Sequence, residues 1–127
     1  MAVFRQPSSA LKAMLDAQKR VADPIRGQPL ALKAGLHVGP CIAVTLNDRL
    51  DYFGSTVNLA ARLEGQSTGE DIVISSAVYD DPDVRSFLGQ PANEVVARRF
   101  EMPLKGFDEE KFALWRVARA KSNSAVF

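Results

Sequence analysis

The sequence has one cysteine and one histidine in 127 residues. Cys41 therefore has no partner for an internal disulfide, and one thiol without clustered histidines is not a metal site. Such cysteine usage is typical of a reducing compartment. No apolar run approaches the ~20 residues that a transmembrane helix needs. The N-terminal MAVFRQP lacks the ordered regions of a secretory signal. These absences predict a cytoplasmic protein.

The chain also lacks a strong charge of either sign. Its 16 Lys and Arg residues nearly balance 15 Asp and Glu residues, and the net charge is +1. There is thus no basic field for nucleic acid and no acidic tail. Apolar residues make up 46% and charged residues 24%, as in an ordinary globular protein. A chain of this size is one domain, or part of one, and can bury a core without disulfides or structural metal.

Hydrophobic spacing predicts an α+β fold with a mostly antiparallel sheet, about seven strands and three or four helices. Residues 1–4 are expected to form a short strand. A helix follows from a serine cap at position 8 or 9, and Pro24 and Gly27 end it. The remaining strands are expected at 30–38, 41–46, 50–53 and 72–75, and in two late segments, VVARRFEM and KFALWRVA. Further helical turns are expected after Gly54 and within 76–88, broken by Pro82.

The segment DYFGSTVNLAARL at residues 51–63 threads polar side chains through an apolar strand-to-helix pattern. Asn58 and Arg62 are four apart, so a helix places them on one face. An amide and a planar guanidinium could orient a ribose or ring oxygen and neutralise a phosphate. Asp51, at the end of the preceding strand, could accept a hydrogen bond from an exocyclic amine. Each residue also has a structural interpretation: a surface helix pair for Asn58 and Arg62, and a hairpin carboxylate for Asp51.

A series of motifs, in order along the chain, favours the functional interpretation of these residues. It consists of AGLHVGP at 34–40, the 51–63 segment, TGEDIVIS at 68–75 and PLKGF at 103–107. Together they resemble the catalytic domain of class III nucleotidyl cyclases, the adenylate and guanylate cyclases. The resemblance covers residues 1–119, and the G-x-x-V-N-x-A-x-R core is its most specific element. Residues 120–127 are expected to be a frayed tail.

The resemblance implies a ferredoxin-like sheet and a homodimer, or a pair with a cyclase-like subunit, that binds ATP or GTP between the subunits. The ribose 3′-oxygen attacks the α-phosphate and pyrophosphate leaves. Asn58 matches the asparagine that orients the ribose, and Arg62 the arginine that stabilises the phosphate transition state. Asp51 matches the base-reading position and favours ATP. Lys105 falls in the loop near the triphosphate, although some family members carry the basic residue two places later, where this chain has Phe107.

The family's first strand and its two metal-binding aspartates have no counterpart here. Mg²⁺ or Mn²⁺ is expected for the complete family domain, but this chain offers no metal ligands, and it is expected to be inactive alone. Asp80, Asp81 and Asp83 are interpreted as a solvated turn. The chain is interpreted as truncated from a complete enzyme, as a subunit that pairs with another, or as a degenerate remnant. Truncation is favoured because Asp51, Asn58 and Arg62 all survive.

Two other functions remain open from the sequence. A cyclase-like dimerisation module could regulate a complete cyclase without catalysing the reaction. An unrelated ferredoxin-like RNA binder is disfavoured by the lack of aromatic-rich strands and of a basic patch. The single histidine, His37, is interpreted as a packing residue between Gly35 and Gly39, and Lys105 alone would be a solvated turn lysine.

Overall fold

The computed structural model describes residues 3–21, 31–39, 42–46, 49–103 and 111–119. For the strands at 42–46 and 49–53 it describes the backbone only. In chain order the elements are α1 (Pro7–Val21), β1 (Ala34–Leu36), β2 (Ile42–Leu46), β3 (Arg49–Phe53), α2 (Ser55–Glu64), β4 (Ile72–Ser75), α3 (Ser76–Tyr79), α4 (Pro82–Gly89), a 3₁₀ turn (Pro91–Asn93), β5 (Val95–Pro103) and β6 (Lys111–Arg119).

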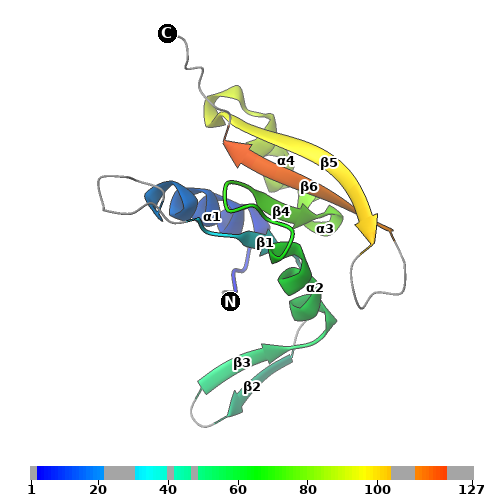
Figure 1. The fold of residues 1–127 in the computed structure, drawn as a ribbon. Helices are drawn as coiled ribbons and strands as arrows, with labels where there is room; N and C mark the ends of the chain where they lie inside the picture. Colours follow the sequence, from blue (N-terminus) through cyan, green and yellow to red (C-terminus); the bar gives the residue numbers. More distant parts are fainter. Residues whose placement is uncertain (1–2, 22–30, 40–41, 47–48, 104–110, 120–127) are drawn as a thin grey trace.

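The main sheet has four strands in the order β1-β4-β6-β5 (Figure 1). The short strand β1 runs parallel to β4, with Gly35 opposite Val73. The other neighbours are antiparallel, and β5 and β6 form a long ladder from Val95 opposite Arg119 to Pro103 opposite Lys111. The mixed α+β, mostly antiparallel architecture expected from the sequence is therefore confirmed.

Helices cover both faces of this sheet. On one face, α1, α3 and α4 pack against alternate strand residues in a core of Leu11, Leu15, Ala34, Ile72, Ile74, Val78, Val84 and Val117. On the other face, α2 packs Leu59 and Leu63 against Val73 and Leu114. Strand β4 is buried on both faces, because each face is covered by a helix. The IVIS segment thus contributes side chains to the core on both faces of the sheet.

Strands β2 and β3 form a separate antiparallel hairpin, with Leu46 paired to Arg49. The hairpin projects away from the main sheet and leads directly into α2 (Figure 1). The expected turn at residues 47–48 lies outside the described residues. The pairing of the flanking strands is nevertheless that of a hairpin, as the sequence predicted.

Three expectations about the first third of the chain were wrong. Val3 and Phe4 are not in a strand, and their side chains are 56% and 41% exposed. The first helix begins at Pro7, so Ser8 lies buried inside its first turn rather than capping it. Within the described residues 31–38 of the predicted strand, only Ala34–Leu36 forms a strand, because β4, its only partner in the described sheet, pairs with these three residues. A strand needs a partner for its backbone groups, and alternation alone does not supply one.

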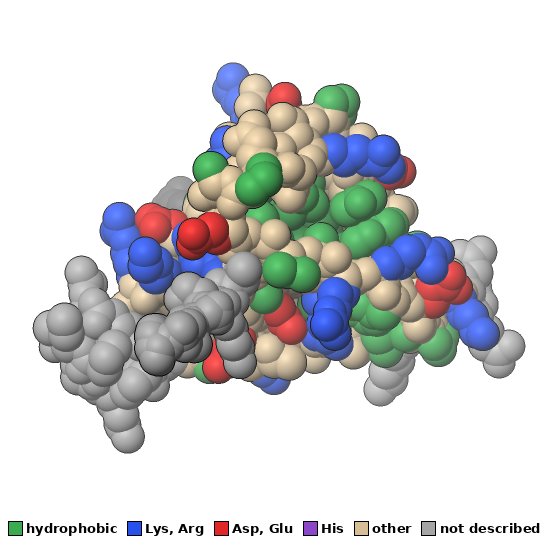
Figure 2. Space-filling view, turned by 90° about the horizontal axis from the view of Figure 1, so that it is seen from above, with side chains coloured by type: hydrophobic (Ala, Val, Ile, Leu, Met, Phe, Trp, Pro, Cys, Tyr) green, Lys and Arg blue, Asp and Glu red, His purple; other side chains and the backbone are tan. Residues whose placement is uncertain are grey.

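The surface seen in Figure 2 mixes charges of both signs. Lys and Arg side chains alternate with Asp and Glu side chains, and hydrophobic side chains lie between them. This face has no continuous basic field. Among the described helices, none has the length and apolar character needed to cross a bilayer.

Candidate active site

Helix α2 presents one face to the core and the other to solvent. Leu59 and Leu63 are 7% and 0% exposed and fix the helix on the sheet. Asn58 and Arg62 are exposed. Residues four apart lie on the same side of a helix, and the polar pair is rotated by one residue, about 100°, from the apolar pair. The structure therefore brings Asn58 and Arg62 together on the outer side of a firmly packed helix, as the sequence predicted.

The turn into α2 depends on Gly54. Its φ of 125° and ψ of 174° belong to a region that only glycine enters readily. Its carbonyl accepts a 3.1 Å hydrogen bond from the backbone N–H of Asn58, the first turn of the helix. A sharp strand-to-helix turn thus places Asn58 one helical turn from the end of β3.

Two glycines of the AGLHVGP segment allow β1 and the following residues to approach α2 closely. A Cβ atom on Gly35 would lie 2.6 Å from the carbonyl carbon of Leu63. A Cβ atom on Gly39 would lie 2.7 Å from Oγ1 of Thr56. Real Cβ atoms essentially never come closer than 3.0 Å to such neighbours. Gly35 and Gly39 therefore lie against opposite ends of the helix that carries Asn58 and Arg62.

The loop after α2 is held by a polar network around Asp71, which is 7% exposed. Its carboxylate accepts hydrogen bonds from the Thr68 backbone N–H at 3.0 Å and from Nη1 of Arg116 at 3.1 Å. Arg116 also donates to the Gln66 carbonyl at 2.7 Å. Ser67 donates to the Asp71 carbonyl at 2.8 Å. These bonds tie the C-terminal end of α2 to strand β6.

Gln18 of α1 makes a second link to the same loop. Its Nε2 donates to the Asp71 carbonyl at 2.6 Å and to the Leu32 carbonyl at 2.8 Å. The side chain is 8% exposed and bridges the entry of β1 and the entry of β4. The roles of Gln18 and Arg116 were not predicted, because the hydrogen bonds that these two side chains make join residues 14 to 53 positions apart in the chain.

His37 joins the ends of β1 and β4. Its Nδ1 lies 2.8 Å from Oγ of Ser75, which is 5% exposed. Partial burial lowers the pKa of His37 from the ordinary value of 6.5, because the charged imidazolium loses hydration. The ring is therefore neutral at pH 7 and bonded to a buried hydroxyl. This supports the packing interpretation of His37.

Two predicted site residues cannot be placed from their side chains. Asp51 pairs with Val44 in the backbone ladder of the β2–β3 hairpin, and its side chain lies outside what the structure describes. Lys105 lies outside the described residues altogether. The backbone does bring Asp51 to the strand that enters Gly54 and α2. The base-reading role of Asp51 and the phosphate role of Lys105 stay predictions.

The arrangement suits the binding of an anionic, hydroxyl-bearing ligand. An amide that both donates and accepts lies one turn from a permanent cation, and both are held on a rigid helix. Comparison with known proteins then decides the family. The model of the adenylate and guanylate cyclase catalytic domain matches residues 8–116 of this chain.

The chain belongs to the adenylate and guanylate cyclase catalytic domain family.

Curated relatives of this chain include guanylate and adenylate cyclases. The rat guanylate cyclase soluble subunit beta-2 is 33% identical over 91 residues, which are 69% of this chain and 12% of that protein. An adenylate cyclase of Mycobacterium tuberculosis is 33% identical over 70 residues, which are 53% of this chain and 16% of that protein. The cyclase domain described here thus spans a small part of these relatives.

Solved structures show the same fold. The catalytic core of a rhodopsin-guanylyl cyclase with converted specificity, in complex with ATPαS, has a TM-score of 0.67 and 27% identity. The match covers 93% of this chain and 62% of that chain. The guanylate cyclase domain of RhGC from Catenaria anguillulae, in complex with GTP, has a TM-score of 0.64 at 24% identity, with 94% and 63% covered. The expected cyclase-like fold is confirmed, and the chain spans under two thirds of each of these domains.

The described residues do not fit the metal ions that cyclase domains generally use. Within the described ranges, no three His, Cys, Asp or Glu residues are grouped so that they could hold a metal ion. Asp81 instead caps α4 by accepting from the N–H groups of Asp83 and Val84 at 2.9 and 3.1 Å. Asp80 forms an exposed ion pair with Arg85 at 2.9 Å. The acidic cluster is the exposed start of helix α4, whereas the sequence predicted a solvated turn, because Asp81 caps a helix that begins at Pro82.

Proposed function

We propose that this chain supplies the asparagine–arginine half of a nucleotide cyclase site formed between two subunits, and that the assembled site converts ATP to cyclic AMP and pyrophosphate. One observation carries the proposal: Asn58 and Arg62 lie exposed on α2, while the neighbouring Leu59 and Leu63 are buried against the sheet. Exposed side chains on a helix that is packed against the sheet can meet a substrate held by a partner. Family membership supplies the reaction class.

The proposed reaction is an internal displacement at phosphorus. The ribose 3′-oxygen forms a bond to the α-phosphorus and its proton leaves to solvent or a base. The bond from the α-phosphorus to the bridging oxygen breaks, and pyrophosphate carries away the electron pair. Asn58 would orient the ribose so that attack is in line. Arg62 would balance the negative charge that grows on the phosphate oxygens.

The chain is proposed to depend on a partner for the rest of the site. Phosphoryl chemistry of this kind draws much of its charge neutralisation from metal ions held on carboxylates. The described residues offer no such group of carboxylates. We therefore propose that residues 1–127 alone form no cyclic nucleotide. The same observation favours a second candidate, a cyclase-like module that pairs with a complete cyclase and regulates it.

ATP is the proposed nucleotide because of Asp51. A carboxylate accepts a hydrogen bond from the adenine amine, whereas it repels the carbonyl oxygen that guanine presents at that position. Lys105 is retained as a candidate contact to the triphosphate. The solved relatives hold ATPαS in one case and GTP in the other, so the base preference is carried by Asp51 alone.

Complementation in trans tests the proposal. The chain is mixed with a cyclase domain that keeps its metal carboxylates but has alanine in place of its own equivalents of Asn58 and Arg62. Formation of cyclic AMP from ATP by the mixture, and by neither protein alone, is the expected result. The mixture should lose this activity when Arg62→Ala is present in this chain.

The two candidate functions give different results in a parallel experiment with an unaltered cyclase domain. A regulatory module changes the rate of the unaltered enzyme but does not restore the alanine variant. If the two chains associate and no mixture forms cyclic AMP, the catalytic proposal is wrong.

A further inference from the structure

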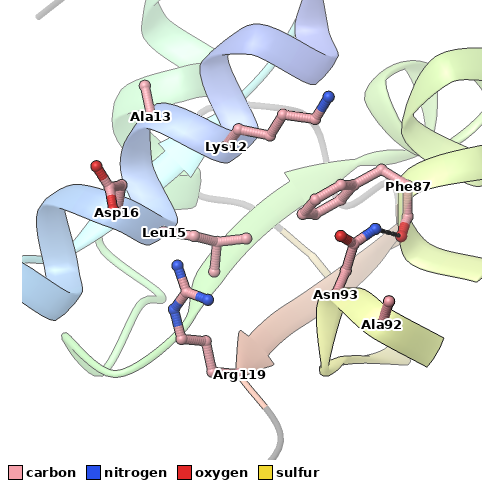
Figure 3. Close-up of a pocket in the computed structure, with 8 residues that line it drawn as sticks. All are labelled: Lys12, Ala13, Leu15, Asp16, Phe87, Ala92, Asn93 and Arg119. Atoms are coloured by element: carbon pink, nitrogen blue, oxygen red, sulfur yellow. Dashed lines mark hydrogen bonds between the residues drawn. The ribbon is translucent and has the colours of Figure 1, made fainter. Parts of the chain in front are cut away.

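A hollow lies on the sheet face opposite to α2, between α1, α4 and the end of β6 (Figure 3). Its volume is about 540 Å³, within the range of roughly 300–1,000 Å³ that small-molecule sites occupy. The sides come from four elements: α1, α4, the 3₁₀ turn and β6. The lining residues are Lys12, Ala13, Leu15, Asp16, Phe87, Ala92, Asn93 and Arg119.

The floor of this hollow is apolar. Leu15 is 2% exposed and the Phe87 side chain packs against the same core. Both side chains point into the space between α1 and the 3₁₀ turn (Figure 3). Ala13 and Ala92 add small side chains that leave room at the rim. Leu15 is almost fully covered, so the partly exposed Phe87 ring is the apolar surface that a flat ligand would cover.

The wall opposite α1 is held rigidly. Nδ2 of Asn93 donates to the Phe87 carbonyl at 2.8 Å (Figure 3). The same nitrogen donates to Oε1 of Gln90 at 3.3 Å. These bonds fasten the 3₁₀ turn to the end of α4. A preformed wall lowers the ordering cost of binding.

The charges at the rim leave positive charge uncompensated. Arg119 extends from the end of β6 towards Leu15, and Lys12 lies at the other end of the opening (Figure 3). Among the described residues Arg119 makes no ion pair, and Lys12 lies over the Phe87 ring with Nζ 5.4 Å from its centroid. The one acid at the rim, Asp16, pairs with Arg20 at 3.4 Å. An anionic ligand would thus balance the positive charge at this rim.

We propose that this hollow binds a small aryl carboxylate, with the ring against Phe87 and the carboxylate on Arg119. A guanidinium matches the two oxygens of a carboxylate in a planar, bidentate fashion. Lys12 adds positive charge at the opposite end of the opening. The site is separate from Asn58 and Arg62, because α1 and α4 lie on one face of the sheet and α2 on the other. The proposal goes beyond the proposed cyclase function and does not rest on it.

The test uses the 127-residue chain, 2-naphthoate as the probe and 2-naphthamide as its neutral counterpart. Binding is followed by the backbone amide NMR signals of residues 12–16 and 87–93. Saturable shifts in these segments with 2-naphthoate are expected, with at least tenfold weaker binding of 2-naphthamide. Arg119→Gln should also weaken 2-naphthoate binding at least tenfold.

Two further variants guard the interpretation. Arg98→Gln is the control, because it removes an exposed arginine of β5 that does not line the hollow. This variant should bind 2-naphthoate normally. Ala92→Phe should fill the rim and block binding while the spectrum stays that of the folded chain. If 2-naphthoate gives no saturable shifts, if Arg119→Gln and Arg98→Gln bind it equally, or if the amide binds as well as the acid, the proposal is overturned.

Discussion

Gly35 of β1 and Leu63 of α2 touch backbone to backbone: a Cβ atom on Gly35 would lie 2.6 Å from the Leu63 carbonyl carbon. The strand and the helix are therefore closer than any side chain at position 35 would permit. This contact determines the distance between α2 and the sheet. It thereby places Asn58 and Arg62, which lie on the outer side of the same helix.

Gly35→Ala is expected to destabilise the chain by about 1–3 kcal/mol or more, because the added methyl group meets backbone that cannot turn aside. The urea midpoint should fall with little change in slope. Gly89→Ala is the matched control: nothing lies within 4 Å of its Cβ position, and the residue ends α4. Its effect should stay within about 0.5 kcal/mol. Equal effects of the two substitutions would contradict the close contact.

Asp71→Asn is expected to cost about 1.5–3 kcal/mol, since it removes the charge that Arg116 meets in a largely buried site. Asp80→Asn is the control, because the Asp80–Arg85 pair is over half exposed on both sides. An exposed pair is worth about 0–1 kcal/mol. Urea unfolding of both variants measures the difference. A loss for Asp71→Asn no larger than for Asp80→Asn would show that the network does not hold the loop.

His37 should make stability depend on pH below neutrality. Its pKa is lowered in the folded chain by burial, so the unfolded chain binds the proton more readily. The free energy of unfolding should therefore fall as the pH is lowered through 6.5, the ordinary value for histidine. His37→Gln should remove this part of the pH dependence between pH 7.5 and 5.5. A variant whose stability falls as steeply as that of the original chain would refute the prediction.

Arg62→Ala, measured in the complementation mixture, is expected to lower kcat about 10²–10³-fold with little change in KM, because its proposed role is to balance charge as the transition state forms. Asn58→Ala should behave similarly. The two effects should not add, since both residues are proposed to act on one substrate from one helix face. Arg20→Ala on α1 is the control and should leave kcat unchanged. Near-normal kcat in both α2 variants would mean that the helix is only structural.

Asp51→Ala should relax the choice of base in the same mixture. The original chain is expected to prefer ATP over GTP, because a carboxylate in this position accepts from adenine and repels guanine. The ratio of kcat/KM for the two nucleotides measures the preference. If GTP is used as readily as ATP, and Asp51→Ala does not change the ratio of kcat/KM, Asp51 does not read the base.

Much of the local structure follows from short-range patterns. The apolar spacing of Leu11, Met14 and Leu15 predicted α1, and Asn58 with Arg62 were placed correctly on one side of a helix after Gly54. Pro82 divides α3 from α4 as expected, because proline favours the first turn of a new helix. These features depend on residues that are neighbours in the chain.

The N-terminal strand shows where such patterns fail. Val3 and Phe4 have strand-like composition, yet they lie exposed and outside any strand. A strand is stable only when its backbone groups meet a partner, and composition does not say which partner is present. The predicted strand at 30–38 shrank to Ala34–Leu36 for the same reason.

The sequence by itself determined the family, the central strand IVIS and the placement of Asn58 and Arg62 on one side of a helix. Each of these depends on the local order and spacing of residues. Only the tertiary structure decided what holds that pair in place. Gly35 meets Leu63, Arg116 meets Asp71, and Gln18 bridges two loops, across separations of up to 53 residues. Contacts of this kind arise when packing brings distant segments together, and no periodicity in the chain encodes which residues will meet.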